Sequence, residues 1–423
     1  MGHYNVWVCV ILIGLLRLSI LCATINLLTK IMFKKLLSCL FCLTCLTCNQ
    51  IACATPYIPS SPDQVLERLP ASTNASQAEF KNLSAQLFAH PNDIGLAVKL
   101  ARLYIERSRA EGDPRYLGYA EAVLAPWWKL SNPPVDILVL RATLLQSTHQ
   151  FDKSLTDLDA VLKSDSANGQ AWITRATILQ VQGKYAAALK SCEQLYVIAP
   201  PLITTTCFSN IQSLSGKAAQ SYHALKAAYV QSSEIDPSIQ VWILTLLAEM
   251  AARLGDDIAA EQYFQNAMKI EEPDGYLLGA YSDFLLDKKR PQEVVKLLKT
   301  KTRIDPLLLR YAEALKAIKS TQTDVQTSAL KQRFAAATMR GDTVHQREQS
   351  RFELRLMNNP KRALALAKLN WQIQKEPADA RIYLEAAISM NDKNEANTVI
   401  NWLAANQQED ATLSRMISKY RSL

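Results

Sequence analysis

Residues 135–146 read VDILVLRATLLQ, and residues 169–180, which begin 34 positions later, read GQAWITRATILQ. Both stretches carry Arg-Ala-Thr at the same place, and Phe151 in the first unit has its counterpart in Tyr185 of the second. A period of 34 is typical of helix–turn–helix units that stack into a solenoid, where each unit packs only on its neighbours. Glycine is scarce, with 12 in 423 residues, and alternating β-branched runs are rare, so strands are not expected. The sequence thus predicts an all-α fold.

The unit 169–202 carries the repeat pattern most completely. Small side chains at Ala176 and Ala188 let two antiparallel helices approach closely, and Gly183 suits the short turn between them. The matching positions are Trp172, Ala176, Leu179, Gly183, Tyr185, Ala188, Leu195 and Pro200. This pattern resembles the tetratricopeptide repeat (TPR) family. The resemblance implies a TPR-like α-solenoid, a right-handed superhelix of antiparallel helix pairs, with Trp172 and Tyr185 in its core.

The repeat signal divides the chain into four parts. Residues 80–308 form the predicted TPR array, and the remaining 309–423 are interpreted as degenerate helical repeats with a C-terminal cap. Ahead of the array, 55–79 is rich in Pro and Ser and is predicted to be a linker, while 1–54 is predicted to be a leader. The units that fit best are 135–168, 169–202, 241–274 and 275–308.

The leader contains the features of a secretory signal. Lys34 and Lys35 precede an apolar run, and Ala-Cys-Ala at 52–54 is a small–x–small cleavage site. Residues 32–54 are therefore predicted to be a signal peptide that is cleaved before Thr55. Cleavage there implies export, and the predicted location is the periplasm of a bacterium.

Two alternatives stay open for residues 1–31. Either translation starts at Met32 and these residues are not part of the protein, or they belong to a longer leader that anchors the chain to a membrane. A lipid on Cys53 would provide another tether. It fits poorly, because Gln50 stands where bacterial lipoprotein signals carry an aliphatic residue.

The cysteines divide into leader and array. Four in the leader have iron–sulfur-like spacing, but they sit in an apolar run and are interpreted as small hydrophobic residues. Past the leader, only Cys192 and Cys207 remain, on helices that the TPR pattern makes packed neighbours. We expect two buried thiols there, with a disulfide as the alternative that an oxidising compartment would permit. The four leader residues are Cys39, Cys42, Cys45 and Cys48.

The sequence contains no catalytic, metal or cofactor motif that we recognise. Its five histidines are isolated, and the predictions are accordingly no enzyme, no metal and no cofactor. The net charge is +8, and the leader contributes four of these charges through its lysines and arginines. The mature part is thus only mildly basic, which argues against nucleic acid as a partner. The histidines are His3, His90, His149, His223 and His345.

The TPR resemblance implies that the first helix of each pair lines a concave groove. The lining is mostly neutral and polar, which suits an extended or helical polypeptide held by side-chain amides and stacking. One TPR subclass grips C-terminal carboxylates with Lys, Asn and Arg; Val139, Thr143, Ile173 and Thr177 stand at those places here, which argues against that use. We call the predicted residues the lining set: Thr143, Gln146, Gln170, Thr177, Gln180, Asn210, Trp242, Glu249, Arg253, Tyr276 and Asp283.

These features predict a non-enzymatic scaffold or adaptor of the bacterial cell envelope that binds a protein or peptide partner. Trp242 in the lining set fits core packing and partner binding equally well. One alternative is an envelope assembly factor tethered to a membrane by 1–31 or by a lipid at Cys53. The other is an enzyme or cofactor carrier with an unrecognised pocket in the C-terminal third.

Overall fold

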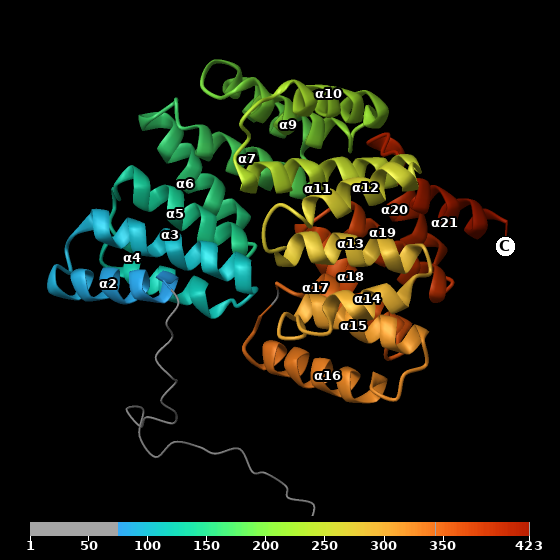
Figure 1. Ribbon diagram of the computed structural model, residues 1–423. Helices are drawn as coiled ribbons and strands as arrows, with labels where there is room; N and C mark the ends of the chain where they lie inside the picture. The colour runs from blue at the N-terminus through green and yellow to red at the C-terminus, as the bar shows by residue number, and fades with distance from the viewer. Residues whose placement is uncertain (1–74, 343, 423) are drawn as a thin grey trace, which may run out of the picture. The chain divides into compact units, whose positions relative to one another are not determined.

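The computed structural model describes residues 75–342 and 344–422. These residues belong to one compact unit, 73–423, and they form twenty α-helices, one short 3-10 helix and no strand (Figure 1). The predicted leader and residues 55–74 of the predicted linker lie outside the described part. Helix α2 (Ala75–Ala89) begins inside the segment predicted to be a linker.

Nine helix pairs follow one another along the described chain, with α2 before them and α21 (Ala411–Arg421) after them. A 3-10 helix, η1 (Gln194–Val197), extends the second helix of the third pair. The pairs are α3 (Ile94–Glu111) with α4 (Arg115–Trp128), α5 (Val135–Ser147) with α6 (Phe151–Ser164), α7 (Gly169–Val181) with α8 (Tyr185–Glu193), α9 (Pro201–Gln212) with α10 (Ala218–Gln231), α11 (Pro237–Leu254) with α12 (Asp257–Ala267), α13 (Gly275–Asp287) with α14 (Pro291–Leu298), α15 (Asp305–Ala317) with α16 (Thr323–Met339), α17 (Gln346–Arg355) with α18 (Pro360–Ile373), and α19 (Pro377–Ser389) with α20 (Lys393–Ala405).

Local sequence signals explain where the helices begin. Asn168 caps α7 by accepting a 3.0 Å hydrogen bond from the Ala171 amide, and Asp274 caps α13 in the same way. Such caps satisfy amides that have no partner within the helix. Pro201 occupies the first position of α9, where its fixed φ is favourable and its missing N–H costs nothing. Pro201 therefore suits the start of α9.

The 34-residue step is kept in part of the array. Helices α5 and α7 begin 34 residues apart, at Val135 and Gly169, as the sequence predicts. The step then varies, because α11 has 18 residues and begins at Pro237, between the predicted units 169–202 and 241–274. The predicted unit 241–274 accordingly starts within α11 and not at its first residue.

The core of the best unit agrees with its sequence. Ala176 and Ala188 are 2% and 0% exposed, which permits the close approach of α7 and α8. Tyr185 is buried, and Trp172 packs against the same cluster while its indole N–H donates to the Ser166 carbonyl at 2.9 Å. The prediction that these two aromatic residues serve packing is confirmed.

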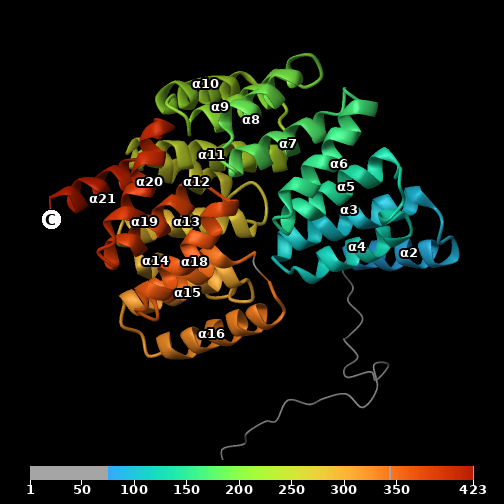
Figure 2. The same cartoon turned by 180° about the vertical axis from the view of Figure 1, so that it is seen from behind.

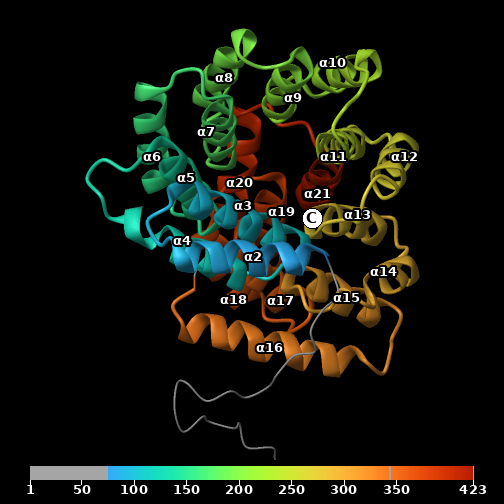
Figure 3. The same ribbon diagram turned by 60° about the vertical axis from the view of Figure 1, so that its left-hand side comes forward.

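The last helix pairs return to the turns of earlier pairs. The Lys375 amide donates to the Val181 carbonyl at 2.8 Å, and the Trp402 ring lies 6.1 Å from that of Tyr185. The Ala218 amide, at the start of α10, donates to the Glu409 carboxylate at 3.2 Å. Figure 3 shows α19, α20 and α21 between α7 on one side and α11 and α13 on the other. The space inside the curve of the array is thus occupied by the chain's own C-terminal helices.

The first pair also meets a later one. The turn at Gly112, between α3 and α4, approaches Ile304 so closely that a Cβ atom there would lie 2.6 Å from the Ile304 side chain. Figure 2 shows the same unit from behind, where α18 and α19 lie in front of α13–α15. Among the described helices, none is both long and apolar enough to cross a bilayer.

Candidate partner-binding surface

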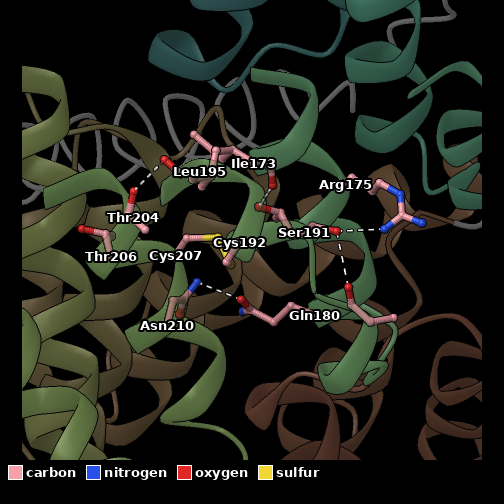
Figure 4. The surroundings of a disulfide bond; sticks show 12 residues. Ile173, Arg175, Gln180, Ser191, Cys192, Leu195, Thr204, Thr206, Cys207 and Asn210 are labelled. Carbon is pink, nitrogen blue, oxygen red and sulfur yellow. Dashed lines mark hydrogen bonds between the residues drawn. A yellow bond between two sulfur atoms is a disulfide. The ribbon is translucent and has the colours of Figure 1, made fainter. Parts of the chain in front are cut away.

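The lining set lies on the first helices of five successive pairs, α5, α7, α9, α11 and α13. Side-chain hydrogen bonds link these helices to one another. Gln180 on α7 accepts from the Asn210 side-chain amide on α9 at 2.9 Å (Figure 4). Arg253 on α11 donates to the Ser213 hydroxyl, which directly follows α9, at 3.0 Å. The structure therefore brings members of the set together along one surface of the array.

The link between α11 and α13 is a carboxylate–phenol pair. The Tyr276 hydroxyl donates to the Glu249 carboxylate, with both O···O distances at 3.0 Å. Burial raises the pKa of Glu249 to about 7, while Arg253 opposes that rise. Tyr276 is nevertheless 59% exposed. The Tyr276 side chain is therefore accessible to solvent, whereas Glu249 beside it is only partly exposed.

Asp283 closes the predicted set, and two arginines bind its carboxylate. Arg310 donates to one oxygen at 2.5 Å, and Arg351 donates to the other at 2.7 Å. Burial by itself would raise the pKa of Asp283, but the two guanidinium groups hold that pKa well below its usual range. Asp283 is thereby committed to contacts within the chain.

The other lining residues contribute little that is free to bind. The Thr143 and Thr177 hydroxyls donate to carbonyls one turn earlier in their own helices. Gln170 donates to Thr174. Trp242 is partly buried against the large core cluster, which favours the packing role for this residue. Gln146 is partly buried.

Sequence reasoning missed a set of charged residues that continues the surface beyond Asp283. Arg351 makes a bidentate pair with Glu313 at 2.6 and 2.7 Å. Arg355 bridges Glu313 and Glu385, with its shortest contact at 2.7 Å. These residues lie on the first helices α15, α17 and α19, so they form the inner face of the later pairs.

The charged series ends where it returns to α13. Arg381 on α19 pairs with Glu385 at 2.9 Å and with Asp287 on α13 at 2.6 Å. We call the whole series the arginine–carboxylate ladder. A signal for it exists in the sequence, because α13, α17 and α19 each carry two of its charges four residues apart, on one helix face. The ladder consists of Asp283, Asp287, Glu313, Arg351, Arg355, Arg381 and Glu385.

The expectation of free thiols at Cys192 and Cys207 is wrong in the structure. The two residues form a disulfide, with their Cα atoms 5.7 Å apart (Figure 4). Cys192 lies on α8 and Cys207 on α9, so the bond joins one helix pair to the next. The sequence placed both residues on packed neighbours, but the distance that decides between thiols and disulfide depends on how the pairs stack.

Chemistry-bearing residues do not gather elsewhere in the described part of the chain. There, no group of three or more His, Cys, Asp or Glu side chains could hold a metal ion. His149 is in contact with Gln374 at 3.1 Å, and burial lowers its pKa. It therefore contributes to packing between the second pair and the C-terminal helices.

Comparisons with known proteins give distant likenesses. No protein-family model matches the chain, and no curated protein matches it. A TPR protein from Parabacteroides merdae has 12% identity, covering 60% of this chain and 91% of that chain, with a TM-score of 0.40. Yeast Tom70 has 10% identity, with 82% and 85% covered and a TM-score of 0.40. Human IFIT1, solved as a dimer with PPP-AAAA, has 13% identity, with 83% and 86% covered and a TM-score of 0.39.

Structural similarity this distant identifies neither a related protein nor a binding partner. The helix pairs themselves establish the fold, because they stack in order and keep the 34-residue step from α5 to α7. Small buried residues also stand where α7 and α8 touch. The protein is a TPR-like α-solenoid.

Proposed function

We propose that the protein is a non-enzymatic scaffold of the bacterial cell envelope that binds a partner polypeptide through the lining set. The observation that carries this proposal is the alignment of these residues on five successive first helices, with Tyr276 accessible beside Glu249. Most hydroxyl and amide groups of the set are bonded within the chain, so the group offered to a partner is the exposed Tyr276 ring, which can contact a polypeptide. The accessible end of this surface, around α11 and α13, is where we place the partner.

A photocrosslinking experiment tests the binding surface. A photoreactive phenylalanine derivative replaces Tyr276, and the protein is irradiated in its native envelope. We expect crosslinks to one defined polypeptide. Phe88 on α2 provides the matched control, because it is aromatic, 90% exposed and outside the lining set. The same crosslinks from position 88, or crosslinks from that position alone, would contradict the proposal.

Binding of the captured polypeptide can then be measured with purified components. Tyr276→Ala should weaken its affinity about tenfold or more, because an accessible aromatic side chain is lost at the contact. Val325→Ala, on the exposed surface of α16, should leave the affinity unchanged. Equal affinities for the two variants would place the contact elsewhere.

We also propose that the protein is exported to the periplasm by a signal peptide at 32–54. The disulfide supports this proposal, because such bonds persist in oxidising compartments and are rare in the cytosol. N-terminal sequencing of the mature protein tests it, with Thr55 as the expected first residue. A mature chain that retains 1–31, or one that begins at an acylated Cys53, would instead support the membrane-tethered assembly factor.

A further inference from the structure

A cleft of about 970 Å³ opens between the first two helix pairs and two later segments. One wall comes from α4, α5 and α6, and the other from residues 303–306 at the start of α15 and from the end of α16 with the residues after it. The turn at Gly112 touches Ile304 at one place in this region. Elsewhere along the cleft the two walls stay apart, whereas the turns of the third to fifth pairs lie against residues 375–411.

The cleft combines apolar walls with cationic groups. Leu117 and Leu144 line the first wall, and Ile304 and Val344 line the second. Binding pockets of this size are typically apolar with a few polar groups that orient the ligand. The polar groups here belong to charged side chains, and their pairing decides what the cleft can hold.

Three of the four carboxylates that line the cleft are already engaged. Asp157 accepts two hydrogen bonds from the Arg141 guanidinium, both at 2.7 Å. Asp305 pairs with Arg333 at 2.7 Å, and Asp342 accepts the Val344 amide at 2.9 Å. The charges of Asp157 and Asp305 are therefore compensated by arginines, whereas Asp342 keeps its negative charge.

Three lining cations, in contrast, have no carboxylate partner among the described residues. Lys153 on α6 donates only to the Gln150 side chain, and Arg303 and Arg340 are exposed. Asp113, whose pKa Arg303 helps to lower, is held by Arg115. Glu121 and Asp342 are the two lining carboxylates without an arginine partner, and they oppose the three unpaired cations. The cleft thus has one positive charge in excess beside apolar surface.

We propose that this cleft binds a segment of a partner polypeptide that carries both acidic and apolar side chains. The cations lie on three separate elements along both walls, which matches carboxylates spaced along a chain. An anionic lipid would instead need its cations gathered at one end of an apolar slot. The cleft is a different surface from the lining set, so this proposal and the proposed function can fail independently.

The test uses the purified protein and three fluorescein-labelled peptides. They consist of repeated Glu-Leu-Ser, Lys-Leu-Ser or Glu-Ser-Ser units, and binding is followed by fluorescence anisotropy. We expect saturable binding of the Glu-Leu-Ser peptide alone, since it supplies both required properties. Absence of that binding, or equal binding of either other peptide, would overturn the proposal.

Charge reversal locates the peptide. Lys153→Glu combined with Arg340→Glu should weaken Glu-Leu-Ser binding at least tenfold, because two attractive contacts become repulsive. Lys163→Glu combined with Lys331→Glu provides the control, since these exposed lysines lie outside the cleft, on α6 with Lys153 and on α16, which Arg340 follows. Equal loss in both double variants would mean that net charge alone holds the peptide.

A steric variant separates binding from folding. Gly118 lines the cleft on α4, and a Cβ atom there would have no neighbour within 4 Å. Gly118→Trp should fill the cleft and abolish peptide binding, with an unchanged far-ultraviolet circular dichroism spectrum. Gly169→Trp, at another unobstructed glycine, should bind normally. Retained peptide binding in Gly118→Trp would overturn the proposal. It would also be overturned if the wild type bound phosphatidylglycerol vesicles instead of the peptide and Gly118→Trp blocked that binding.

Discussion

Each of the nine described helix pairs turns through one residue with left-handed backbone, yet only four of these residues are glycines. L-residues other than Gly adopt this conformation at a cost of about 1–2 kcal/mol. The repeat therefore constrains the backbone conformation of the turn more strictly than the type of amino acid at that position. In chain order the turn residues are Gly112, His149, Gly183, Gly216, Gly255, Lys289, Lys319, Asn358 and Asn391.

Lys319→Gly should stabilise the fold. Lys319 is exposed with φ of 55°, so glycine relieves the backbone while no contact is lost, and we expect a gain of about 0.5–1 kcal/mol in the free energy of unfolding. Urea denaturation measures it. Gly255→Ala provides the reverse change, since its Cβ would lie 3.8 Å from its nearest neighbour and only the backbone would be strained. A lower free energy of unfolding for Lys319→Gly would mean that the lysine side chain does not strain the backbone of this turn.

Glu249 should make stability fall as pH rises. Its folded pKa of about 7 exceeds the ordinary value of 4.5, so the folded state holds a proton that the unfolded state has released. The stabilisation is complete below the unfolded pKa and is lost as pH rises through about 7, by on the order of 3 kcal/mol. The measurement compares the free energy of unfolding of the wild type and Glu249→Gln from pH 4.5 to 8. Parallel pH profiles for the two proteins would contradict this assignment.

At the scale of helices, neighbouring pairs are joined by specific links in addition to apolar packing. The disulfide ties α8 to α9, and the arginine–carboxylate ladder ties α13 and α15 to α17 and α19. Burying charges is costly unless each one is paired. The ladder therefore specifies how these helices align, because a shifted alignment would leave carboxylates buried without partners.

Removing the disulfide should destabilise the array. The bond closes a loop across a sequence separation of 15 residues, and loss of such a constraint costs about 3 kcal/mol. We expect this loss in chemical denaturation of the Cys192→Ala, Cys207→Ala double variant. Dithiothreitol should lower the stability of the wild type and leave the double variant unchanged. Equal stability of the oxidised wild type and the double variant would show that the bond does not form in the protein.

Breaking the ladder at Arg351 should cost more than breaking a surface ion pair. Arg351→Met keeps the apolar stem but leaves Asp283 and Glu313 short of a partner, and we expect a loss of about 3–5 kcal/mol. Arg362→Met is the control, because Arg362 is 57% exposed where it pairs with Glu353, and its loss should cost less than about 1 kcal/mol. Similar unfolding midpoints for the two variants would mean that the ladder adds no net stability.

At the scale of the described unit, the array packs on itself between its early turns and its last helices. Gly183 and Gly216 are the closest points, because a Cβ atom would lie 3.0 Å from the Trp402 ring at the first and 2.5 Å from the Gln407 side chain at the second. Glycine is required there by the neighbouring helix as well as by its own φ. In a TPR-like solenoid with open ends, only the positive φ would require glycine.

Gly183→Ala should report on this closure. Both Gly183 and Gly255 have positive φ, but a Cβ atom would lie 3.0 Å from Trp402 at the first and at an ordinary contact distance of 3.8 Å from Ala411 at the second. Gly183→Ala should therefore cost about 1 kcal/mol or more beyond Gly255→Ala. Hydrogen exchange should accelerate in α20 and α21, while α5 and α6 stay unchanged. Equal costs and unchanged exchange in α20 would show that the last helices do not rest on this turn.

The sequence predicts part of the candidate surface. It does not predict that the last helices pack against the turns of earlier pairs. Gln180, Asn210, Glu249 and Tyr276 could be placed on first helices because the repeat assigns each position to a helix face. Their hydrogen-bond partners lie 30 and 27 residues away, in the next pair, which is the range that the repeat covers. Arg351 was not predicted, because the repeat pattern weakens after residue 308.

The amino-acid sequence by itself determined that this protein is all-α and built of stacked pairs, because small residues, caps and turns recur within a window of about one repeat. Only the tertiary structure decided that Cys192 bonds Cys207, and that the chain's last helices occupy the inside of its curve. The disulfide depends on the exact distance between two adjacent pairs, which the repeat pattern does not fix. The contacts of the last helices join residues far apart in sequence, as Ala218 and Glu409 are at 191 positions. These contacts depend on the accumulated rotation from pair to pair, which no local pattern encodes.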